Sequence, residues 1–292
     1  MDTKIKLCII IPIIILFLII LLFVLYINKI IGFKNYSQED YEIEKEKIIN
    51  SKYLNDLSQN HKTLQEIPKQ IYMTYHKKNI PEKVFTNLKK YATYDNEPIP
   101  CTIFNDDDAI KFLSKYYNKS VIDKFKSLSG AHKADLFRYC LLYIKGGIYM
   151  DIKTELIKPL IEVIDLDKKN TFYSVYGHKF FGKRQQIYQG IIITPPRNEI
   201  IFKLIVDVIE TPTFITKLNY LIFTQQFYKI ANDHTDSELK PGFNKLKDHL
   251  DLYIFQEILE ETCEKPDRYG VCANIYDQDN KIIKTRFDDY PW

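Results

Sequence analysis

The longest apolar run of the chain lies near its N-terminal end. Residues Leu7 to Ile27 carry no charged side chain, and about 20 apolar residues are what a helix needs to cross a bilayer core. The run is longer than the apolar part of a cleavable signal peptide, and no small-residue cleavage site follows it. We therefore predict a short tail at residues 1–6 and a retained single-pass transmembrane anchor at residues 7–27. Lysines flank the run on both sides, which leaves its orientation open.

A polar stretch follows the anchor. Residues 28–66 are rich in Glu, Lys, Asn and Gln, and their apolar positions are scattered. Such a pattern is typical of a solvated helical stem rather than of a core. At Ile67 the pattern changes to alternating, β-prone positions. We predict that residues 67–292 form the globular domain and that residues 28–66 separate it from the membrane.

Strand and helix patterns alternate through this domain. Strand patterns occupy residues 70–75, 101–104, 171–177 and 190–196. Helical patterns occupy residues 82–91, 106–117, 131–145 and 198–209. The region 271–287 has the pattern of two strands around a polar turn. Alternating strands and helices predict an α/β fold with a mostly parallel sheet.

The helix predicted at Ala131–Lys145 is apolar on almost every face but carries two charges. A helix of this kind is mostly buried, so its polar side chains need partners. Asp135 and Arg138 are three residues apart and are therefore neighbours on one face. By itself, this spacing favours a structural ion pair within the helix.

The element that follows the helix changes this interpretation. Gly146 and Gly147 end the helix, and a short buried strand begins at once. Alternation along that strand places Asp151 and Lys153 on one face, at its carboxyl end. Ligands of open α/β sheets gather beyond the carboxyl ends of strands. The pattern therefore favours a site for a polar, phosphorylated ligand.

Charge and cysteine content narrow the function classes further. The net charge of +3 is close to balance, which argues against a nucleic-acid partner. The five cysteines have no metal-ligand spacing. Cys263 and Cys272 could pair if the domain faces an oxidising lumen, and could equally stay reduced if it does not.

The motif residues resemble those of a known family. The chain is similar to the glycosyltransferases related to the yeast initiation α-1,6-mannosyltransferase, and to the glucosylating domain of large clostridial toxins. The similarity lies in the run Ala134-Asp135-x-x-Arg138-Tyr139-x-x-Leu142-x-x-x-Gly146-Gly147-Ile148-Tyr149-x-Asp151, in the opening "IPKQIYMTY" and in "IKPL". It covers roughly residues 67–194. The resemblance implies a single Rossmann-like domain of the GT-A type, in a single-pass membrane protein of Golgi or ER type with a lumenal catalytic domain.

The resemblance also implies an activity. Such enzymes move a hexose from a nucleotide-diphospho-sugar, here UDP- or GDP-hexose, to a glycan or protein hydroxyl, with retention of anomeric configuration. It assigns donor-sugar contacts to Asp135 and Arg138, a carboxylate and a planar charged fork suited to hydroxyl groups. The remaining predicted substrate-binding residues are Gly147, Tyr149, Gln189 and Trp292. Trp292 is expected either to close over the donor, as in the toxin relatives, or to be a packed chain end.

One position departs from the family. The family motif is Asp-x-Asp and holds a divalent metal, Mn²⁺ or Mg²⁺, against the diphosphate. Here Asp151 is followed by Lys153, and a charged lysine does not ligate such a cation. Three alternatives follow. Lys153 takes over the electrostatic role of the metal, so that Asp151 and Lys153 are the catalytic residues; Asp151 and Glu155 hold a metal in altered geometry; or catalysis is lost, leaving a silent membrane-tethered binding or scaffold protein.

Overall fold

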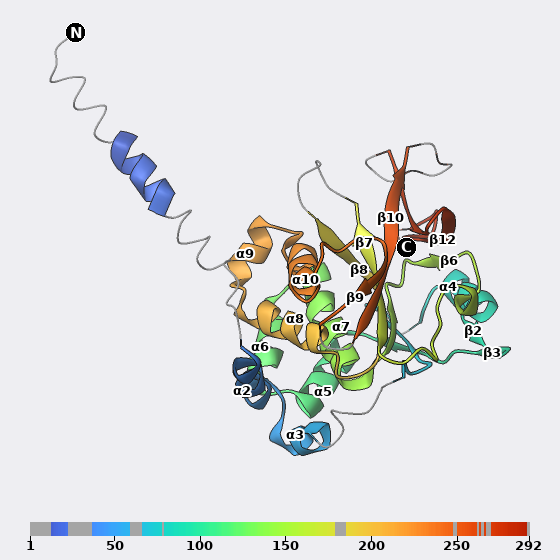
Figure 1. Cartoon of the computed structure of the whole chain (residues 1–292), viewed down its shortest axis with the longest axis horizontal. Helices are drawn as coiled ribbons and strands as arrows, with labels where there is room; N and C mark the ends of the chain where they lie inside the picture. The colour runs from blue at the N-terminus through green and yellow to red at the C-terminus, as the bar shows by residue number, and fades with distance from the viewer. Residues whose placement is uncertain are drawn as a thin grey trace, which may run out of the picture. The chain divides into compact units, whose positions relative to one another are not determined.

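The computed structural model describes residues 13–22, 37–58, 66–77, 79–178, 185–247, 250–261, 263, 266 and 270–290. The chain divides into two compact units, Met1–Tyr41 and Glu42–Trp292. The second unit contains the predicted domain, and its elements are shown in Figure 1.

A ten-stranded mixed sheet forms the centre of the second unit. Its strands are β1 (Ile71–Thr74), β4 (Cys101–Phe104), β5 (Gly147–Met150), β6 (Glu155–Leu156), β7 (Thr171–Gly177), β8 (Gln186–Thr194), β9 (Gly242–Lys245), β10 (Asp251–Glu260), β11 (Cys272–Asp277) and β12 (Asn280–Lys284). Their order is β4-β1-β5-β8-β7-β10-β11-β12-β6, with β9 paired to β10. A separate ribbon joins β2 (Thr93–Tyr94) and β3 (Glu97–Pro98).

The pairing confirms the α/β class and refines the predicted sheet. β4, β1 and β5 are parallel, as are β7 and β10. β8 runs antiparallel to both of its neighbours, and β11 and β12 add antiparallel strands at the far side. The sheet is therefore mixed rather than mostly parallel. The physical reason is that a tight turn such as that between β11 and β12 reverses the strand direction, whereas a parallel pair needs a long crossover.

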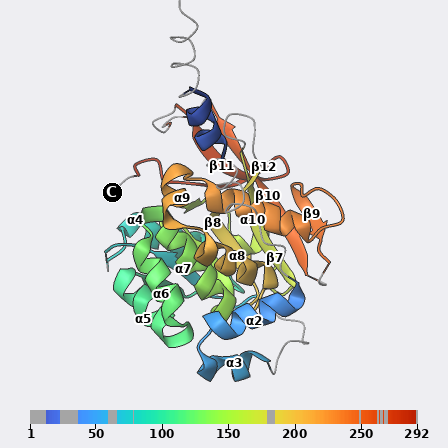
Figure 2. The same ribbon diagram turned by 90° about the vertical axis from the view of Figure 1, so that its left-hand side faces the viewer.

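The helices cover both faces of the sheet unequally. They are α4 (Glu82–Tyr91), α5 (Asp106–Tyr116), α6 (Lys119–Ser127), α7 (Gly130–Lys145), α8 (Glu199–Glu210), α9 (Thr213–Leu218) and α10 (Ile222–Asp233). In Figure 2 the helices α6, α7, α8 and α10 lie in front of the strands. On the other face α4 buries Val84 and Leu88 in a cluster with Ile71, Ile148 and Ile193. This layering buries both faces of β5 and nearly all of β8, whereas β1 alternates between buried and half-buried positions.

The residues before the domain are partly packed against it. α2 (Gln38–Ile48) and α3 (Ser51–Ser58) lie within the predicted stem. Ile49 is fully buried and forms a bridge with Tyr117, and Lys45 pairs with Glu199 at 2.8 Å. The compact unit therefore begins at Glu42, well before the predicted boundary at residue 67.

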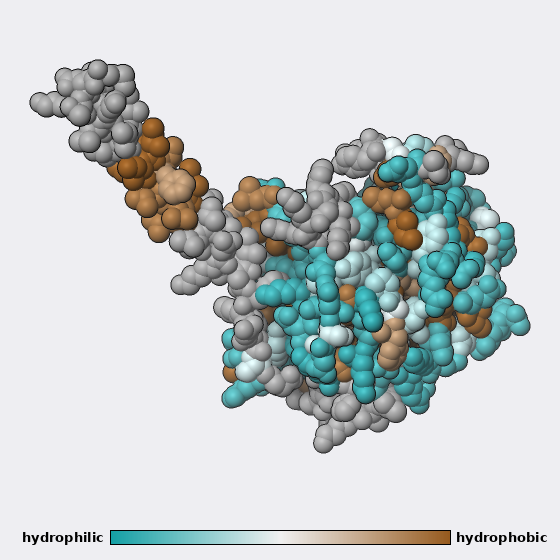
Figure 3. Space-filling model, turned by 45° about the horizontal axis from the view of Figure 1, so that its top comes forward, coloured by the Kyte–Doolittle hydropathy of each residue, from teal (hydrophilic) through white to brown (hydrophobic). Residues whose placement is uncertain are grey.

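The predicted anchor is described only in part. Residues 13–22 form a helix whose large apolar side chains are exposed, the brown helical segment of Figure 3. Residues 7–12 and 23–27 lie outside the described residues. Within the described part of the chain, no helix has both the length and the hydropathy for a membrane crossing.

Candidate active site at the end of strand β5

The Gly-Gly turn sets the position of the motif. Gly146 ends α7 with φ of 61°, and Gly147 begins β5 with φ of 101°. A Cβ on Gly146 would lie 2.5 Å from the backbone nitrogen of Pro196, and one on Gly147 would lie 2.8 Å from the carbonyl oxygen of Gln70. Both positions therefore need glycine for conformation and for space. After this turn β5 lies between β1 and β8, and Asp151 follows the carboxyl end of β5.

Arg138 is the centre of a buried charge network. Its Nη2 atom lies 3.3 Å from Oδ1 of Asp135 and 3.2 Å from Oδ1 of Asp151, so one guanidinium bridges two carboxylates. The Arg138 side chain is only 5% exposed. The predicted intrahelical pair thus exists, but it also extends to the end of β5.

Other elements fix the guanidinium in place. Its Nη1 donates to the backbone carbonyl of Gln189, and Nε donates to the carbonyl of Ala134 at 3.3 Å. The register of β8 against β7 shifts close to this point, and a bulge of this kind frees a carbonyl from the sheet ladder. The ring of Tyr149 lies 4.5 Å from the guanidinium carbon, and its hydroxyl bonds Thr74 Oγ1 at 2.8 Å.

Burial and charge shape the titration of this network. Burial raises the pKa of Asp135 to about 6, against the lowering effect of the Arg138 charge. Burial alone would lower the pKa of Arg138, but Tyr149, Asp151 and Asp135 around it raise the pKa above its usual value. Arg138 therefore remains a cation, while Asp135 titrates close to neutral pH.

A cavity of about 480 Å³, which we call the motif cavity, opens beside this network. Its charged lining residues are Arg138, Asp151, Lys153, Lys133 and Asp106. Its aromatic walls include Tyr75, Phe104, Phe125, Phe137, Tyr220 and Tyr290. Aromatic faces beside charged groups suit a ligand that carries a ring and phosphates.

Lys153 and Lys133 differ in how closely they are paired. Lys153 Nζ lies 3.8 Å from Oδ2 of Asp151, beyond hydrogen-bond distance, and the lysine side chain is 34% exposed. Lys133 Nζ donates to Asp106 at 2.7 Å. The backbone of Lys153 is fixed instead, because its carbonyl accepts a 2.8 Å hydrogen bond from the amide of Phe287.

The structure brings four of the predicted residues together and places two others against Arg138. Asp135, Arg138, Asp151 and Lys153 form one connected group. Tyr149 and Gln189 are buried, and their described contacts support Arg138. Gly147 lies at the opposite end of β5. Of the described residues lining the motif cavity, none is Asp135, Gly147, Tyr149 or Gln189. Trp292 lies outside the described residues.

Several lining residues were missed by the sequence analysis. Lys133 lies one turn before Phe137 on α7, so its position on the motif helix was a usable signal. Asp106 lies in the first turn of α5, which was predicted only as a helix start. Tyr220 and Tyr290 come from distant segments, and no local pattern could have brought them to the same cavity.

The described acidic groups do not form a metal site at this position. Both carboxylate oxygens of Asp151 face cations, Arg138 and Lys153. Glu155, the other acid considered, pairs with Lys284 at 3.2 Å. No group of three or more His, Cys, Asp or Glu residues in the described part of the chain is arranged to hold a metal ion. The residues present therefore do not fit the divalent cation of an Asp-x-Asp motif.

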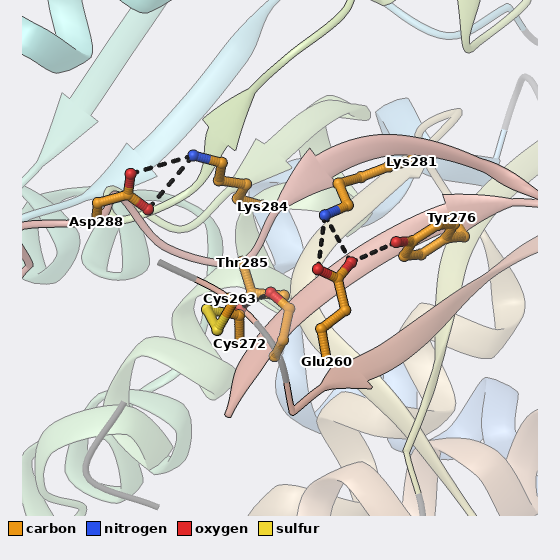
Figure 4. The surroundings of a disulfide bond; sticks show 9 residues. Glu260, Cys263, Cys272, Tyr276, Lys281, Lys284, Thr285 and Asp288 are labelled. Atoms are coloured by element: carbon orange, nitrogen blue, oxygen red, sulfur yellow. Dashed lines mark hydrogen bonds and ion pairs between the residues drawn. A yellow bond between two sulfur atoms is a disulfide. The ribbon is translucent and has the colours of Figure 1, made fainter. Parts of the chain in front are cut away.

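A second charged cavity, which we call the hairpin cavity, lies at β10–β12. Its volume is about 260 Å³, and its lining includes Cys263, Cys272, Lys281, Glu260 and Asp288. Cys263 and Cys272 form a disulfide. Figure 4 shows Lys281 bonded to Glu260, and Lys284 directed at Asp288.

Comparison with known proteins supports the motif assignment. Residues 33–173, slightly less than half of the chain, match the family model described as "Glycosyltransferase sugar-binding region containing DXD motif". Two curated relatives are named initiation-specific alpha-1,6-mannosyltransferase. The Saccharomyces cerevisiae protein is 30% identical over 155 residues, covering 46% of this chain and 32% of the relative. The Candida albicans protein is 34% identical over 124 residues, covering 38% and 31%.

The chain therefore spans about a third of the length of the curated relatives that it matches. A solved structure titled "PaToxG Glycosyltransferase" is also similar, with a TM-score of 0.34 and 16% identity, covering 57% of this chain and 77% of that one. A similarity at this level carries no argument about the site. The family resemblance predicted from the motif is confirmed by the sequence comparisons.

Proposed function

We propose that this chain, whose residues 33–173 belong to the family of glycosyltransferase sugar-binding regions containing a DXD motif, transfers a hexose from a nucleotide-diphospho-sugar to a hydroxyl group. The acceptor class is a glycan or a protein, and the donor is a UDP- or GDP-hexose. The fold of the catalytic unit is of the GT-A type, and the transfer retains the anomeric configuration.

One observation carries this proposal above the others. Arg138 bridges the carboxylates of Asp135 and Asp151 and lines the motif cavity, which also has aromatic side chains in its walls. A carboxylate at this position accepts hydrogen bonds from sugar hydroxyls, and the guanidinium fixes its orientation. Burying such charges costs free energy, so their convergence at a strand end beside a cavity favours a functional role over a merely structural one.

The residues have distinct roles in the proposed reaction. Asp135 and Arg138 orient the sugar, and Asp151 faces the ribose side of the donor. The bond from sugar C1 to the β-phosphate oxygen breaks, and its electron pair stays on the diphosphate. The acceptor hydroxyl oxygen bonds C1 on the same face, and its proton passes to a diphosphate oxygen. Charge builds up on the leaving oxygen, so nearby cations accelerate this step.

A donor-cleavage assay tests the proposal. The full chain, purified in detergent, is incubated with UDP- and GDP-hexoses, and release of nucleoside diphosphate is measured. We expect slow release with at least one donor and a loss of at least 100-fold in Asp151→Asn, which keeps the side-chain shape. The Lys281→Ala variant of the hairpin cavity serves as the matched control. Absence of release with every donor from folded protein would favour a silent binding or scaffold protein.

The proposed setting is a membrane-tethered domain in an oxidising compartment. The Cys263–Cys272 disulfide supports an oxidising environment, because cytosolic thiols are kept reduced. The uncharged run at residues 7–27 supports a tether to the membrane.

A further inference from the structure

The cations of the motif cavity have a role that the family motif does not assign to them. A nucleotide-diphospho-sugar brings two negative charges on its diphosphate, and in the Asp-x-Asp motif a divalent cation offsets them. Here the second position is a lysine, Lys153, and the described acids do not form a metal site. The charge of the diphosphate must therefore be balanced by another group in the cavity.

Arg138 is poorly suited to this task. Its side chain is 5% exposed and contacts two carboxylates and two backbone carbonyls. Moving the guanidinium toward a ligand would leave Asp135 buried without its cation, which is energetically costly. Arg138 is therefore a fixed part of the wall.

Lys153 and Lys133 have the freedom that Arg138 lacks. Lys153 is one-third exposed, and its only carboxylate contact within 4 Å in the described structure is a long one, 3.8 Å from Asp151. Lys133 is 25% exposed and pairs with Asp106, whose own side chain is 67% exposed. An exposed pair is held weakly, so either ammonium group can turn toward a phosphate at little cost.

We propose that the ammonium groups of Lys153 and Lys133 bind the donor diphosphate in place of a divalent cation, so that donor binding and sugar transfer are independent of metal. This inference rests on the proposed function, because it presupposes a nucleotide-diphospho-sugar in the motif cavity. Lys153 stabilises the charge that develops on the leaving oxygen as the C1–oxygen bond breaks. Lys133, which lines the same cavity from α7, provides the second cation for the diphosphate.

Calorimetric binding of UDP and GDP to the full chain tests the proposal without relying on turnover. We expect one of these nucleotides to bind in EDTA, and Mn²⁺ to change its affinity less than twofold. Raising the salt concentration should weaken the binding, because lysine–phosphate attraction is screened. Lys153→Met should weaken binding in EDTA by 10- to 100-fold, and Lys133→Met by 3- to 10-fold.

The decisive variant is Lys153→Asp, which restores the Asp-x-Asp pattern. We expect it to bind nucleotide poorly in EDTA and to recover at least 10-fold in affinity on addition of Mn²⁺. Lys281→Met is the matched control, since Lys281 has nearly the same exposure as Lys153 but lies in the hairpin cavity. It should bind like the unmodified protein.

The possible failures are distinguishable. Nucleotide binding that requires Mn²⁺, or binding in EDTA that is unchanged in Lys153→Met, would overturn the metal-free inference and leave the glycosyltransferase proposal standing. Failure of the folded protein to bind either nucleotide, with or without Mn²⁺, would overturn both.

Discussion

Two lysine–carboxylate pairs in this protein have nearly identical exposure but different nitrogen–oxygen distances. Lys153 and Asp151 of the motif cavity have side chains 34% and 21% exposed, and Lys281 and Glu260 of the hairpin cavity have side chains 32% and 22% exposed. The closest nitrogen–oxygen distance is 3.8 Å in the first pair and 2.6 Å in the second. Exposure and charge therefore do not distinguish Lys153 from Lys281, but the pairing distance does.

The difference in pairing distance comes from the other group that each carboxylate contacts besides its lysine. Asp151 is already engaged by Arg138, so its charge is only partly available to Lys153. Glu260 also accepts a hydrogen bond from the hydroxyl of Tyr276, which brings no competing cation. Lys281 is thus satisfied within the protein, and Lys153 retains capacity for an external anion. Of these two lysines, only Lys153 has a charge that its local partners leave incompletely balanced.

Among the variants that test the contrast between the motif cavity and the hairpin cavity, Arg138→Ala is expected to have the largest effect. The change leaves Asp135 and Asp151 without their bridging cation, and breaking a buried ion pair costs about 3–5 kcal/mol of unfolding free energy. It should also abolish donor cleavage. Denaturant unfolding and the donor-cleavage assay measure the two effects. A loss of stability below 1 kcal/mol would show that the network does not hold the wall of the motif cavity.

Removal of the disulfide tests whether the hairpin cavity is structural. Cys263 and Cys272 are nine residues apart, and closing a loop of this length stabilises a fold by about 2–3 kcal/mol. The double change Cys263→Ser and Cys272→Ser should lower the unfolding free energy by this amount. Nucleotide binding in the motif cavity should stay within twofold. A larger loss of nucleotide affinity would contradict the separation of the two cavities.

The pH dependence of stability reports on Asp135. Burial raises its pKa in the folded state to about 6, from an ordinary value of 3.8. The folded state therefore holds this proton more tightly than the unfolded state, so the contribution to stability is full below pH 3.8 and is lost as the pH rises through 6.

Asp135→Asn should remove this loss. Between pH 4 and pH 7, the unmodified protein should therefore lose roughly 2 kcal/mol of unfolding free energy relative to the variant. Urea titrations at several pH values measure the shift. Lys281→Ala, far from this network in the chain, provides a control with no such trend. Parallel curves for Asp135→Asn would contradict the assigned pKa.

The smallest effect is expected from Lys281→Ala itself. Partly exposed ion pairs contribute about 0–1 kcal/mol. The variant should therefore differ little from the unmodified protein in thermal unfolding, in nucleotide affinity and in donor cleavage. A marked loss of donor cleavage in this variant would mean that the hairpin cavity takes part in the reaction, and the contrast between the two cavities would fail.

Much of the motif region could be predicted because its signals are local. The apolar pattern of α7, the glycines at positions 146 and 147, and the alternation into β5 all act over a few residues. The ion pair between Asp135 and Arg138 follows from helical spacing alone. The helices α4, α5 and α8 could also be predicted from local signals. Proline precedes α4, acidic residues begin α5 and asparagine precedes α8.

The missed elements depend on distant partners. The segment Asp251–Glu260 has no strict alternation, and its strand conformation is fixed by β7 on one side and β11 on the other. The short helix α6 is an exception, because Val121 and Phe125 face the core at helical spacing and were a usable local signal. The direction of β8 likewise depends on which neighbours it meets in the sheet, because β-strand preference is mostly a matter of context.

The sequence by itself determined the family resemblance, the α/β class and the candidate residues Asp135, Arg138, Asp151 and Lys153. These follow from spacing along one helix and one strand, which backbone geometry fixes over short distances. Only the tertiary structure decided how their charges are shared. The carbonyl of Gln189 reaches Arg138 from 51 residues away, and Lys284 removes Glu155 from the site. Whether Lys153 can serve a diphosphate depends on these distant partners, because electrostatic balance is set by distance in space and not along the chain.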